Sequence, residues 1–425
     1  MTRRVRGAAG STFRSLKVRN YKLFFFGQLV SVSGTWMQQV AQDWLVLKLS
    51  DSGTAVGITT GLQFLPMLLF GMVGGIIADR RDKRRVLLAT QTTAGLIALA
   101  MGVLVMSGHV ALWHVYLLAF LLGCVTAVDN PTRQAFVTEM VGPDEVTNAV
   151  GLNSATFNAA RVVGPAVAAI VIQVSGIAPA FFVNAASYLA VLAGLHAMRP
   201  EELFRQAPAP RSAGQIREGL RYVWATPELR STIALVLVVA TFGMNLSVVL
   251  PLLARFTFHG TAGTYGLLMS TMAVGSLGGA LVAANRTRID PRLRVATAGV
   301  FGALSMLTAA APTLWLAAVL LVPTGAAAIT FMALSNSTLQ LSSAAHMRGR
   351  VMALYALVFL GSTPIGGPLI GWLSEVWSPR WSFALGGAIT VVGAAVTWLR
   401  LPKPAVVTPR RPIARRALTR VAWWA

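Results

Sequence analysis

The sequence predicts an all-α membrane protein in which twelve transmembrane helices form two pseudo-symmetric six-helix bundles. Only 12% of its 425 residues are charged and 55% are hydrophobic, whereas soluble domains average about 25% charged residues. The hydrophobic residues form long runs, and most of the basic residues lie between these runs. Several landmarks of the first half also recur in the second half. Together these observations favour a bilayer-spanning, internally duplicated fold.

Twelve apolar runs have roughly the 17–25 residues that a helix needs to cross a bilayer. We expect spans at residues 22–47, 54–78, 86–107, 112–131, 150–173, 178–197, 231–253, 264–284, 295–312, 314–337, 351–373 and 381–400. A polar stretch after the sixth run divides them six and six. The predicted units are a cytoplasmic N-terminal segment (1–20), an N-terminal bundle (21–197), a cytoplasmic linker (198–230), a C-terminal bundle (231–400) and a basic cytoplasmic tail (401–425).

The distribution of basic residues predicts how these spans are oriented in the membrane. If the N-terminus lies inside, 32 of the 36 Lys and Arg residues fall in inner segments and three fall in outer segments. Cytoplasmic segments of membrane proteins carry such an excess, so we expect both termini in the cytoplasm and the protein in the cytoplasmic (inner) membrane. A net charge of +22 can also indicate nucleic-acid binding. Because the charge lies in short segments between spans, we expect the lipid bilayer and no nucleic acid as partner.

Three sets of residues recur in the second half of the chain at nearly one offset, between 203 and 206 residues. The sets are Gly71, Gly74 and Gly75 with Gly275, Gly278 and Gly279; Gly164-Pro165 with Gly367-Pro368; and Asn130 and Gln134 with Asn336 and Gln340. Chance matches in glycine-rich helices would give one such coincidence, but not three in order. We infer a parallel duplication about an axis along the membrane normal.

The stretch from Gly71 to Arg85, GMVGGIIADRRDKRR, runs from an apolar helix into an acid and a basic cluster. Its glycines let a neighbouring helix pack closely, and its charges mark the cytoplasmic end of the second span. Such a junction favours a conformational latch over a substrate site. The gating and latch candidates are Gly75, Asp79, Arg80, Lys83 and Arg84, together with Arg133 on the fourth span.

This junction and the six-plus-six order of helices resemble the major facilitator superfamily. Its signature after the second helix reads Gly-x-x-x-Asp-Arg-x-Gly-Arg/Lys-Arg, and Asp82 stands here at the second glycine. The resemblance implies the major facilitator fold and a latch in which Asp79 faces the positive N-terminus of the eleventh span, near Val351. Breaking and remaking that contact would bias inward-facing against outward-facing states.

The fifth span resembles a second signature of that superfamily, Gly-x8-Gly-x3-Gly-Pro-x2-Gly-Gly, which proton-coupled exporters carry. Alanine replaces three of the glycines. The matching positions are Gly151, Ala160, Gly164, Pro165, Ala168 and Ala169. We expect helix packing from Gly151, Gly164 and Pro165, and from Gly367 and Pro368 in the second half. The segments GTWMQQVAQDWLVLKLSDS and DNPTRQAFVTEMV are similar to a bacterial branch that includes the enterobactin exporter and related proton-coupled drug and secretion exporters.

Two acidic residues, Asp43 and Asp129, are the candidates for an acid within a span, and such residues are functional by default. Asp43 borders a polar stripe on the first span and has no oppositely charged neighbour one turn away. This arrangement suits a proton carrier, although an interfacial acid that reaches outer water would fit equally well. Asp129 lies one turn from Arg133, which favours a gating or structural ion pair over a proton carrier.

The polar stripe on the first span must face away from lipid, towards a water-filled cavity. The substrate-cavity candidates are Gln38, Gln39, Gln42, Thr35, Asn158, Arg161 and Asn245. Arg161 is the one basic residue well within a span. It therefore needs an acidic partner, namely Asp43 or Asp129, an anionic substrate, or a path for its side chain to cytoplasmic water. Asn245 could equally make a hydrogen bond between helices.

The sequence gives no sign of a cofactor, a metal site or catalytic residues. It has no Gly-Lys-Ser/Thr phosphate-binding loop, and its five His residues and single Cys show no ligand spacing. We therefore predict a transporter and not an enzyme. The expected function is export of small hydrophobic or amphipathic molecules, drug-like compounds or siderophore-type metabolites, by proton antiport through alternating access, with the monomer as the working unit. An importer or facilitator of a small solute on the same fold is the alternative.

Overall fold

The computed structural model describes residues 13–204, 215–285 and 290–401. Every regular element in this part of the chain is helical. Most of the predicted N-terminal segment, the middle of the predicted linker and the predicted tail beyond residue 401 lie outside the described residues.

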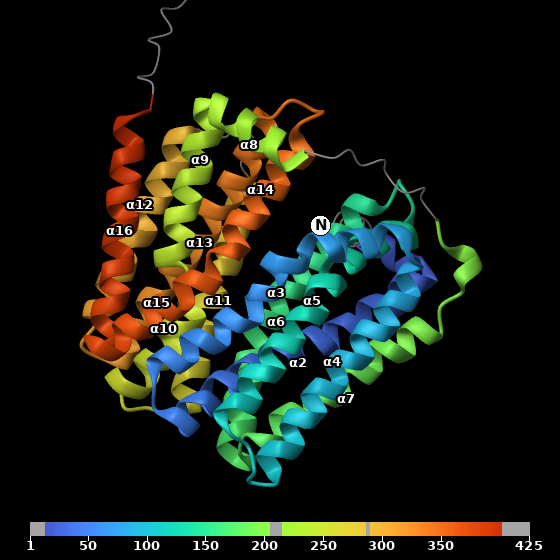
Figure 1. Ribbon diagram of the computed structural model, residues 1–425, viewed down its shortest axis with the longest axis horizontal. Coiled ribbons are helices and arrows are strands. Elements are labelled where there is room, and N and C mark those ends of the chain that lie inside the picture. Colours follow the sequence, from blue (N-terminus) through green and yellow to red (C-terminus); the bar gives the residue numbers. More distant parts are fainter. Residues whose placement is uncertain (1–12, 205–214, 286–289, 402–425) are drawn as a thin grey trace, which may run out of the picture.

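The helices form two lobes, which Figure 1 shows side by side. The first lobe consists of η1 Arg14–Lys17, α2 Arg19–Ser50, α3 Gly53–Arg80, α4 Lys83–Met106, α5 Leu112–Val141, α6 Val146–Ser175 and α7 Ala178–His196. Between the lobes come η2 Pro200–Glu202 and α8 Gln215–Ala225. The second lobe consists of α9 Pro227–Val238, η3 Val239–Gly243, α10 Leu246–Leu252, η4 Leu253–Thr257, α11 Ala262–Ala284, α12 Pro291–Ala310, α13 Leu314–Ser342, α14 Arg348–Gly361, α15 Thr363–Val376 and α16 Pro379–Leu399.

Eleven helical segments of the described chain are long and apolar enough to cross a membrane. Helix α2, at the first predicted span, is not among them, although it is 32 residues long. Its polar stripe lowers its hydropathy, and the amides of Gln28, Gln38 and Gln42 are buried inside the protein. The prediction of an all-helical, multi-span membrane protein is thus confirmed.

Helix α5 is longer than its sequence predicts, because it continues through Pro131 to Val141. Proline is tolerated in spanning helices where neighbouring groups satisfy the backbone polar atoms that it frees. The Thr132 hydroxyl donates to the Val128 carbonyl at 2.7 Å in this turn. The span was predicted to end at residue 131, whereas the helix runs on to Val141. One consequence is that the acid Glu139 lies within α5 and not in a loop.

Two other predicted spans are interrupted where they face each other. The seventh passes from α9 through the π-helical turn η3 to α10, with Asn245 at the junction. The eleventh is divided into α14 and α15 at Ser362, just before Pro364, which cannot donate a helical hydrogen bond. A Cβ added to Gly366 of α15 would lie 2.3 Å from the Thr241 carbonyl oxygen. The two interruptions therefore pack against each other through a glycine.

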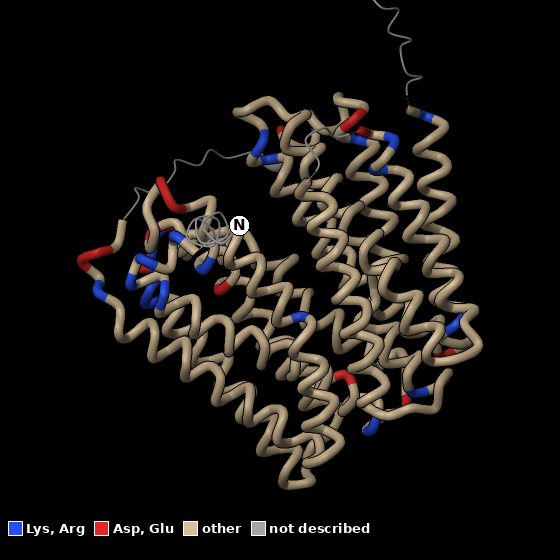
Figure 2. The backbone as a smooth tube through the Cα atoms, turned by 180° about the vertical axis from the view of Figure 1, so that it is seen from behind, with Lys and Arg blue, Asp and Glu red and all other residues tan. Residues whose placement is uncertain are grey.

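The lobes meet through two pairs of helices, α3 with α15 and α6 with α11. A Cβ on Gly57 of α3 would lie 2.4 Å from the Gly367 carbonyl oxygen, and a Cβ on Gly266 of α11 would lie 2.7 Å from the Pro165 carbonyl oxygen. The lobes converge at the end that carries the α2–α3 turn, residues 51–52, and spread apart towards α8 (Figures 1 and 2). We call these ends the closed end and the α8 end.

Glycines also bring helices close together within each lobe. A Cβ on Gly74 would lie 2.0 Å from the Ala127 carbonyl oxygen, which joins α3 to α5. In the second lobe a Cβ on Gly275 would lie 1.8 Å from the Val322 carbonyl oxygen, which joins α11 to α13. A Cβ on Gly71, the sequence counterpart of Gly275, would meet nothing within 4 Å. Glycines therefore bring helices close together in both lobes. Gly71 and Gly275 correspond in sequence, but only Gly275 lies at a close helix contact.

We expect Gly275→Ala to destabilise the protein, because the added methyl group forces α11 and α13 apart. Overpacking of this kind costs about 1–3 kcal/mol, and thermal melting in detergent would measure it. Gly278→Ala is the matched control, since its Cβ would meet nothing within 4 Å and alanine favours a helix. Equal melting temperatures for the two variants would contradict the close packing of these helices.

Candidate functional site

Hydrogen bonds that join the two lobes gather at the closed end. The Ser52 hydroxyl and the Thr54 backbone N–H both donate to Oε2 of Glu375, at 2.6 Å and 3.0 Å. Nearby, Nη2 of Arg255 lies 3.2 Å from Oδ1 of Asp51. The side chains of this ion pair are 42% and 63% exposed, and exposed pairs contribute only about 0.2–1 kcal/mol. The exposed ion pair therefore adds little to the free energy that holds the lobes together.

Asp43 makes the buried contact between the lobes. It lies on α2 with no exposed surface, and the Tyr265 hydroxyl of α11 donates to its Oδ2 at 2.7 Å. The Gln39 amide, one turn earlier on α2, donates to Oδ1 at 3.0 Å. Hydrogen bonds to charged groups are worth about 1.5–3 kcal/mol. In the described part of the chain no cation pairs with Asp43, so its ionised form has only neutral donors.

The predicted polar stripe of α2 divides into packing and exposed positions. The Gln38 carbonyl accepts a hydrogen bond from the Asn184 amide at 2.6 Å, and Gln42 donates to Gln63 at 3.2 Å. Both glutamines are buried and join α2 to its neighbours. Thr35 is exposed, and its hydroxyl donates to the Ser31 carbonyl at 3.0 Å. The stripe therefore presents Thr35, but neither Gln38 nor Gln42, to the surface of the helix bundle.

Asp129 has a fixed cation and two further donors. Nε of Arg133 lies 3.6 Å from its Oδ2, and the Thr90 hydroxyl and Gln91 amide donate to Oδ1 at 2.8 Å and 2.7 Å. Arg133 also donates to Oε1 of Gln28 at 3.2 Å. This network joins α5 to α4 and α2. Its charge is balanced within the network, in contrast to the charge of Asp43.

The charges of the 71–85 junction bind the helix ends around it. Nζ of Lys83 lies 2.7 Å from Oε1 of Glu139, with side chains 12% and 8% exposed. The Arg84 guanidinium donates to the Leu195 and His196 carbonyls at 2.6 Å and 3.2 Å, and a cation at the C-terminus of a helix is favourable. Lys83 and Arg84 thus join α4 to α5 and α7.

Asp82, at the second glycine of the superfamily signature, caps α4. Its side chain accepts a hydrogen bond from the Arg85 N–H at 3.0 Å, with extended backbone angles that need no glycine. Arg80 is exposed, whereas Gly75 and Asp79 are half-buried. Helix α14, whose start was expected near Asp79, approaches α3 at Gly361, where a Cβ would lie 2.8 Å from Leu68. The latch of Asp79 stays a prediction.

Arg161 lies at the middle of the 30-residue helix α6, about 15 residues from either end. Its guanidinium carbon lies 5.6 Å from the centre of the Trp36 ring, and Trp36 packs edge-on against Phe157 at 5.7 Å. Neither Asp43 nor Asp129 pairs with it, because each has other partners. The expected acidic partner is therefore not found among the described residues.

The other predicted polar and packing residues have local contacts. The Asn158 amide donates to the Ser154 carbonyl at 2.8 Å, and the buried Asn245 amide donates to the Thr241 carbonyl at 2.6 Å. Both bonds are local, so no hydrogen bond of the described residues joins Asn245 to another spanning segment, and its place in a substrate cavity stays a prediction. A Cβ on Gly164 would lie 2.5 Å from Cβ of Trp36, whereas a Cβ on Gly151 would meet nothing within 4 Å.

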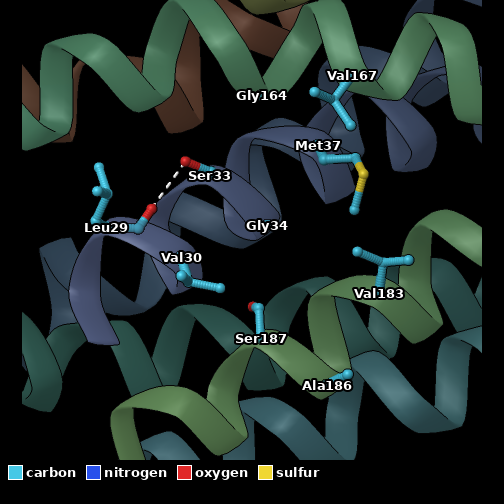
Figure 3. Close-up of a pocket in the computed structure, with 10 residues that line it drawn as sticks. All are labelled: Leu29, Val30, Ser33, Gly34, Met37, Gly164, Val167, Val183, Ala186 and Ser187. Carbon is cyan, nitrogen blue, oxygen red and sulfur yellow. Dashed lines mark hydrogen bonds between the residues drawn. The ribbon is translucent and has the colours of Figure 1, made fainter. Parts of the chain in front are cut away.

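A pocket of about 500 Å³ lies between α2, α6 and α7 (Figure 3). Its lining is mostly apolar. The lining residues are Leu29, Val30, Ser33, Gly34, Met37, Gly164, Val167, Val183, Ala186 and Ser187. The rim valines Val30, Val167 and Val183 are 51%, 41% and 49% exposed, which suits a surface that faces lipid. Of the residues proposed from the sequence, this pocket includes only Gly164.

Sequence reasoning missed Tyr265, Glu139 and Glu375. Tyr265 could have been selected from the sequence as a hydrogen-bond donor, because a buried tyrosine usually needs a hydrogen-bond partner for its hydroxyl. Glu139 was missed because Pro131 was taken as the end of its helix. Glu375 lies next to the last residue of α15, and its contact with Ser52 depends on the arrangement of the lobes.

The fold and these contacts define a membrane transporter. The chain matches the family described as transmembrane secretion effector over residues 10–415, and it belongs to that family of the major facilitator superfamily. Membership makes it a transporter of small molecules and not an enzyme, in a family of the bacterial inner membrane.

Several relatives and solved structures are similar to this chain. It is 28% identical to the multidrug efflux pump Tap of Mycolicibacterium fortuitum, over 91% of this chain and 95% of that protein. It is 28% identical to the staphyloferrin A transporter of Staphylococcus aureus, over 61% and 66%. It is 24% identical to the enterobactin exporter EntS of Citrobacter koseri, over 88% and 90%.

Solved structures support the fold alone. A bacterial homologue of the human lysosomal transporter Spinster, in an inward-facing and unoccupied conformation, matches with a TM-score of 0.71 at 15% identity, over 89% of this chain and 96% of that chain. The nucleoside transporter NupG matches with a TM-score of 0.73 at 14% identity, over 90% and 99%.

We expect Lys83→Met to destabilise the protein, because it leaves the carboxylate of Glu139 buried without its cation. Breaking a buried pair by removing one partner costs about 3–5 kcal/mol. Thermal melting in detergent would measure the loss, and the double variant Lys83→Met, Glu139→Leu should recover most of it. Arg81→Met, at an exposed position of the same turn, is the control. If Lys83→Met melted like Arg81→Met, the pair would have no structural role.

Proposed function

We propose that this protein exports small hydrophobic or amphipathic molecules from the cytoplasm by proton antiport through alternating access. The observation that carries the proposal is the buried Asp43–Tyr265 hydrogen bond, which joins the lobes at 2.7 Å. A titratable group at the contact between two mobile bodies can couple its protonation to their movement. The paragraphs below develop the fold, orientation, coupling and substrate parts of this proposal.

The proposed fold has twelve spans, with α2 as the twelfth beside the eleven apolar ones. The domain bounds would be 21–197 and 231–400 for the bundles and 198–230 for the linker. Two contacts support a duplication. Gly61 faces Pro368 across α3 and α15, where a Cβ would lie 3.2 Å from the proline ring, and Gly266 faces Pro165 across α6 and α11. The offsets between corresponding residues are 205 and 203.

The proposed orientation puts the α8 end in the cytoplasm. Basic residues gather at the α8 end of both lobes, and few lie at the closed end (Figure 2), as the preference of basic residues for the cytoplasmic side predicts. Both chain termini would then be cytoplasmic. In this orientation the closed end seals the outer side, and the structure corresponds to an inward-facing state.

We propose Asp43, and not Asp129, as the proton carrier. Asp129 has Arg133 as a counterion at 3.6 Å, so protonating Asp129 would leave the half-buried Arg133 guanidinium without a carboxylate partner. Asp43 has only neutral donors, so it can exchange a proton without leaving another charge behind. Its exchange with outer water requires the Tyr265 contact to open.

The proposed cycle follows from these contacts. With the outer side closed, Gln39 and Tyr265 donate to the Asp43 carboxylate and stabilise its ionised form. Substrate then enters from the cytoplasm between the lobes. When the contacts of Asp43 and Asp51 break, the outer side opens, substrate leaves and Asp43 takes up a proton. When the outer side closes again, Gln39 and Tyr265 donate to Asp43 once more, and the proton is released to the cytoplasmic side. Asp79 and the 71–85 junction would form the latch of the state in which the outer side is open.

We infer the substrate class from the named relatives and from the polar side chains on α2 and α6 that are not fully buried. The named relatives handle drugs, enterobactin and staphyloferrin A. We propose drug-like or siderophore-type molecules for this chain, bound near Thr35, Gln39, Asn158 and Arg161. We also propose that the monomer is sufficient, because each lobe supplies one side of the path.

Asp43→Asn should abolish proton-driven accumulation of the uncharged amphipathic dye Nile red in everted membrane vesicles, because asparagine cannot exchange a proton. Asp129→Asn should lower the rate but keep the response to the proton gradient. Asp144→Asn, at an exposed position, is the control and should behave as wild type. Gradient-driven accumulation by Asp43→Asn at the wild-type rate would remove this residue from the mechanism. Loss of Nile red from everted vesicles, instead of accumulation, would favour an importer.

A further inference from the structure

Arg161 holds a positive charge at the middle of a spanning helix. About 15 residues of α6 separate it from either end, which corresponds to roughly 22 Å of helix at 1.5 Å per residue. The sequence alone allowed a path for the side chain to cytoplasmic water. The structure leaves Arg161 half-buried, so water hydrates its guanidinium only in part, and a negative partner would stabilise the charge further.

No acid of the described chain compensates Arg161. Within the helices, Asp43 is bound by Gln39 and Tyr265, Asp129 by Arg133, and Glu139 by Lys83. Arg161 itself has one partner in this part of the chain, the Trp36 ring. A cation over an aromatic face gains about 0.5–2 kcal/mol, which offsets part of the desolvation cost but does not balance the charge.

Arg161 lies beside the contact between α6 and the second lobe. Its neighbour Val162 accepts a hydrogen bond from the Ser270 hydroxyl of α11 at 3.2 Å, and Pro165 contacts Gly266 of the same helix. These contacts lie on the closed-end side of Arg161. On the α8 side of it the lobes spread apart (Figure 1), and Phe157 is 46% exposed. Arg161 is therefore next to the place where the lobes separate.

Other groups around Arg161 complete a small recognition surface. Trp36 supplies a broad ring that is itself half-buried, and Phe157 packs against its edge. Asn158, half-buried one turn towards the α8 end of the same helix, adds a polar side chain. The combination is one guanidinium without a counterion, two aromatic rings and one neutral polar side chain.

We propose that Arg161 and Trp36 recognise the anionic group of an amphipathic organic anion, with an aromatic or other flat apolar part of the same molecule against Trp36 and Phe157. A guanidinium binds a carboxylate through two parallel hydrogen bonds, and its plane can stay stacked on the indole while it does so. The bound anion supplies the charge that the protein lacks. This inference rests on the proposed function and narrows its substrate class.

The same charge selects against cations. A cationic amphipath at this position would face an unbalanced like charge in a medium of low dielectric constant, and specificity often comes from such repulsion. An anionic lipid headgroup has the same chemistry as the proposed substrate. The depth of Arg161 favours a molecule that enters between the lobes, and the experiment below separates the two sources.

The test measures binding of 2-naphthoate and of its neutral amide, 2-naphthamide, to the full chain in phosphatidylcholine nanodiscs by calorimetry. Wild type should bind the naphthoate about tenfold more tightly, as a charge-assisted bidentate contact predicts. Arg161→Gln should bring the two affinities together, and Arg161→Lys should keep part of the difference. Arg380→Gln is the matched control, because Arg380 also stacks on a ring at 5.6 Å, that of Phe258, but at the closed end. It should keep the wild-type ratio.

Equal affinities in wild type, or an unchanged ratio in Arg161→Gln, would overturn the inference, and the wild-type ratio decides even if a variant fails to fold. In nanodiscs with phosphatidylglycerol, an unchanged naphthoate affinity supports a substrate site, whereas its loss by lipid competition at Arg161 would overturn that assignment. The measurement needs no proton gradient. Proton-driven Nile red uptake with equal naphthoate and naphthamide affinities would overturn this inference alone. A tenfold ratio without proton-driven uptake would overturn the proposed antiport and support this site.

Discussion

A carboxylate without a counterion, closed between two lobes, is the constraint on which the rest of this structure depends. Asp43 has no exposed surface, and its donors are a glutamine on its own helix and the Tyr265 hydroxyl across the lobe contact. An ionised group in such a place costs several kcal/mol unless hydrogen bonds stabilise it. The lobes supply one of those bonds only when they are together. In the proposed mechanism this contact links the charge state of Asp43 to the position of the lobes.

The charged side chains inside the first lobe differ from Asp43 in their partners. Lys83 and Glu139 are paired at 2.7 Å, and Asp129 has Arg133 as its cation. Both pairs lie within the first lobe, so they can keep it rigid while it moves as a body. Arg161 combines features of both, since it lies within one lobe, like the ion pairs, but has no acidic partner among the described residues. A rigid body with one unbalanced cation on its surface suits a partner that brings a negative charge.

The sequence predicted the helical membrane fold because apolar runs and basic segments are local properties. It also predicted the Asp129–Arg133 proximity, because residues four apart in a helix are neighbours. It could not predict the Tyr265 contact, which joins residues 222 apart through the arrangement of two lobes. Pro131 misled the prediction of α5, since proline breaks helices in water but is tolerated in a protein-lined membrane helix. The polar stripe of α2 was visible in sequence, but its division into packed and exposed positions depends on Asn184 and Gln63.

The most direct measurement of this linkage uses spin labels on a Cys124→Ala chain in nanodiscs. One pair, at Lys48 and Trp377, spans the closed end, and a second pair, at Arg81 and Arg221, spans the α8 end; all four positions are exposed. The account predicts that lowering the pH, or Asp43→Asn at neutral pH, lengthens the first distance and shortens the second. Distances that ignore both changes, or that lengthen together, would contradict the link between the Asp43 charge and the movement of the lobes.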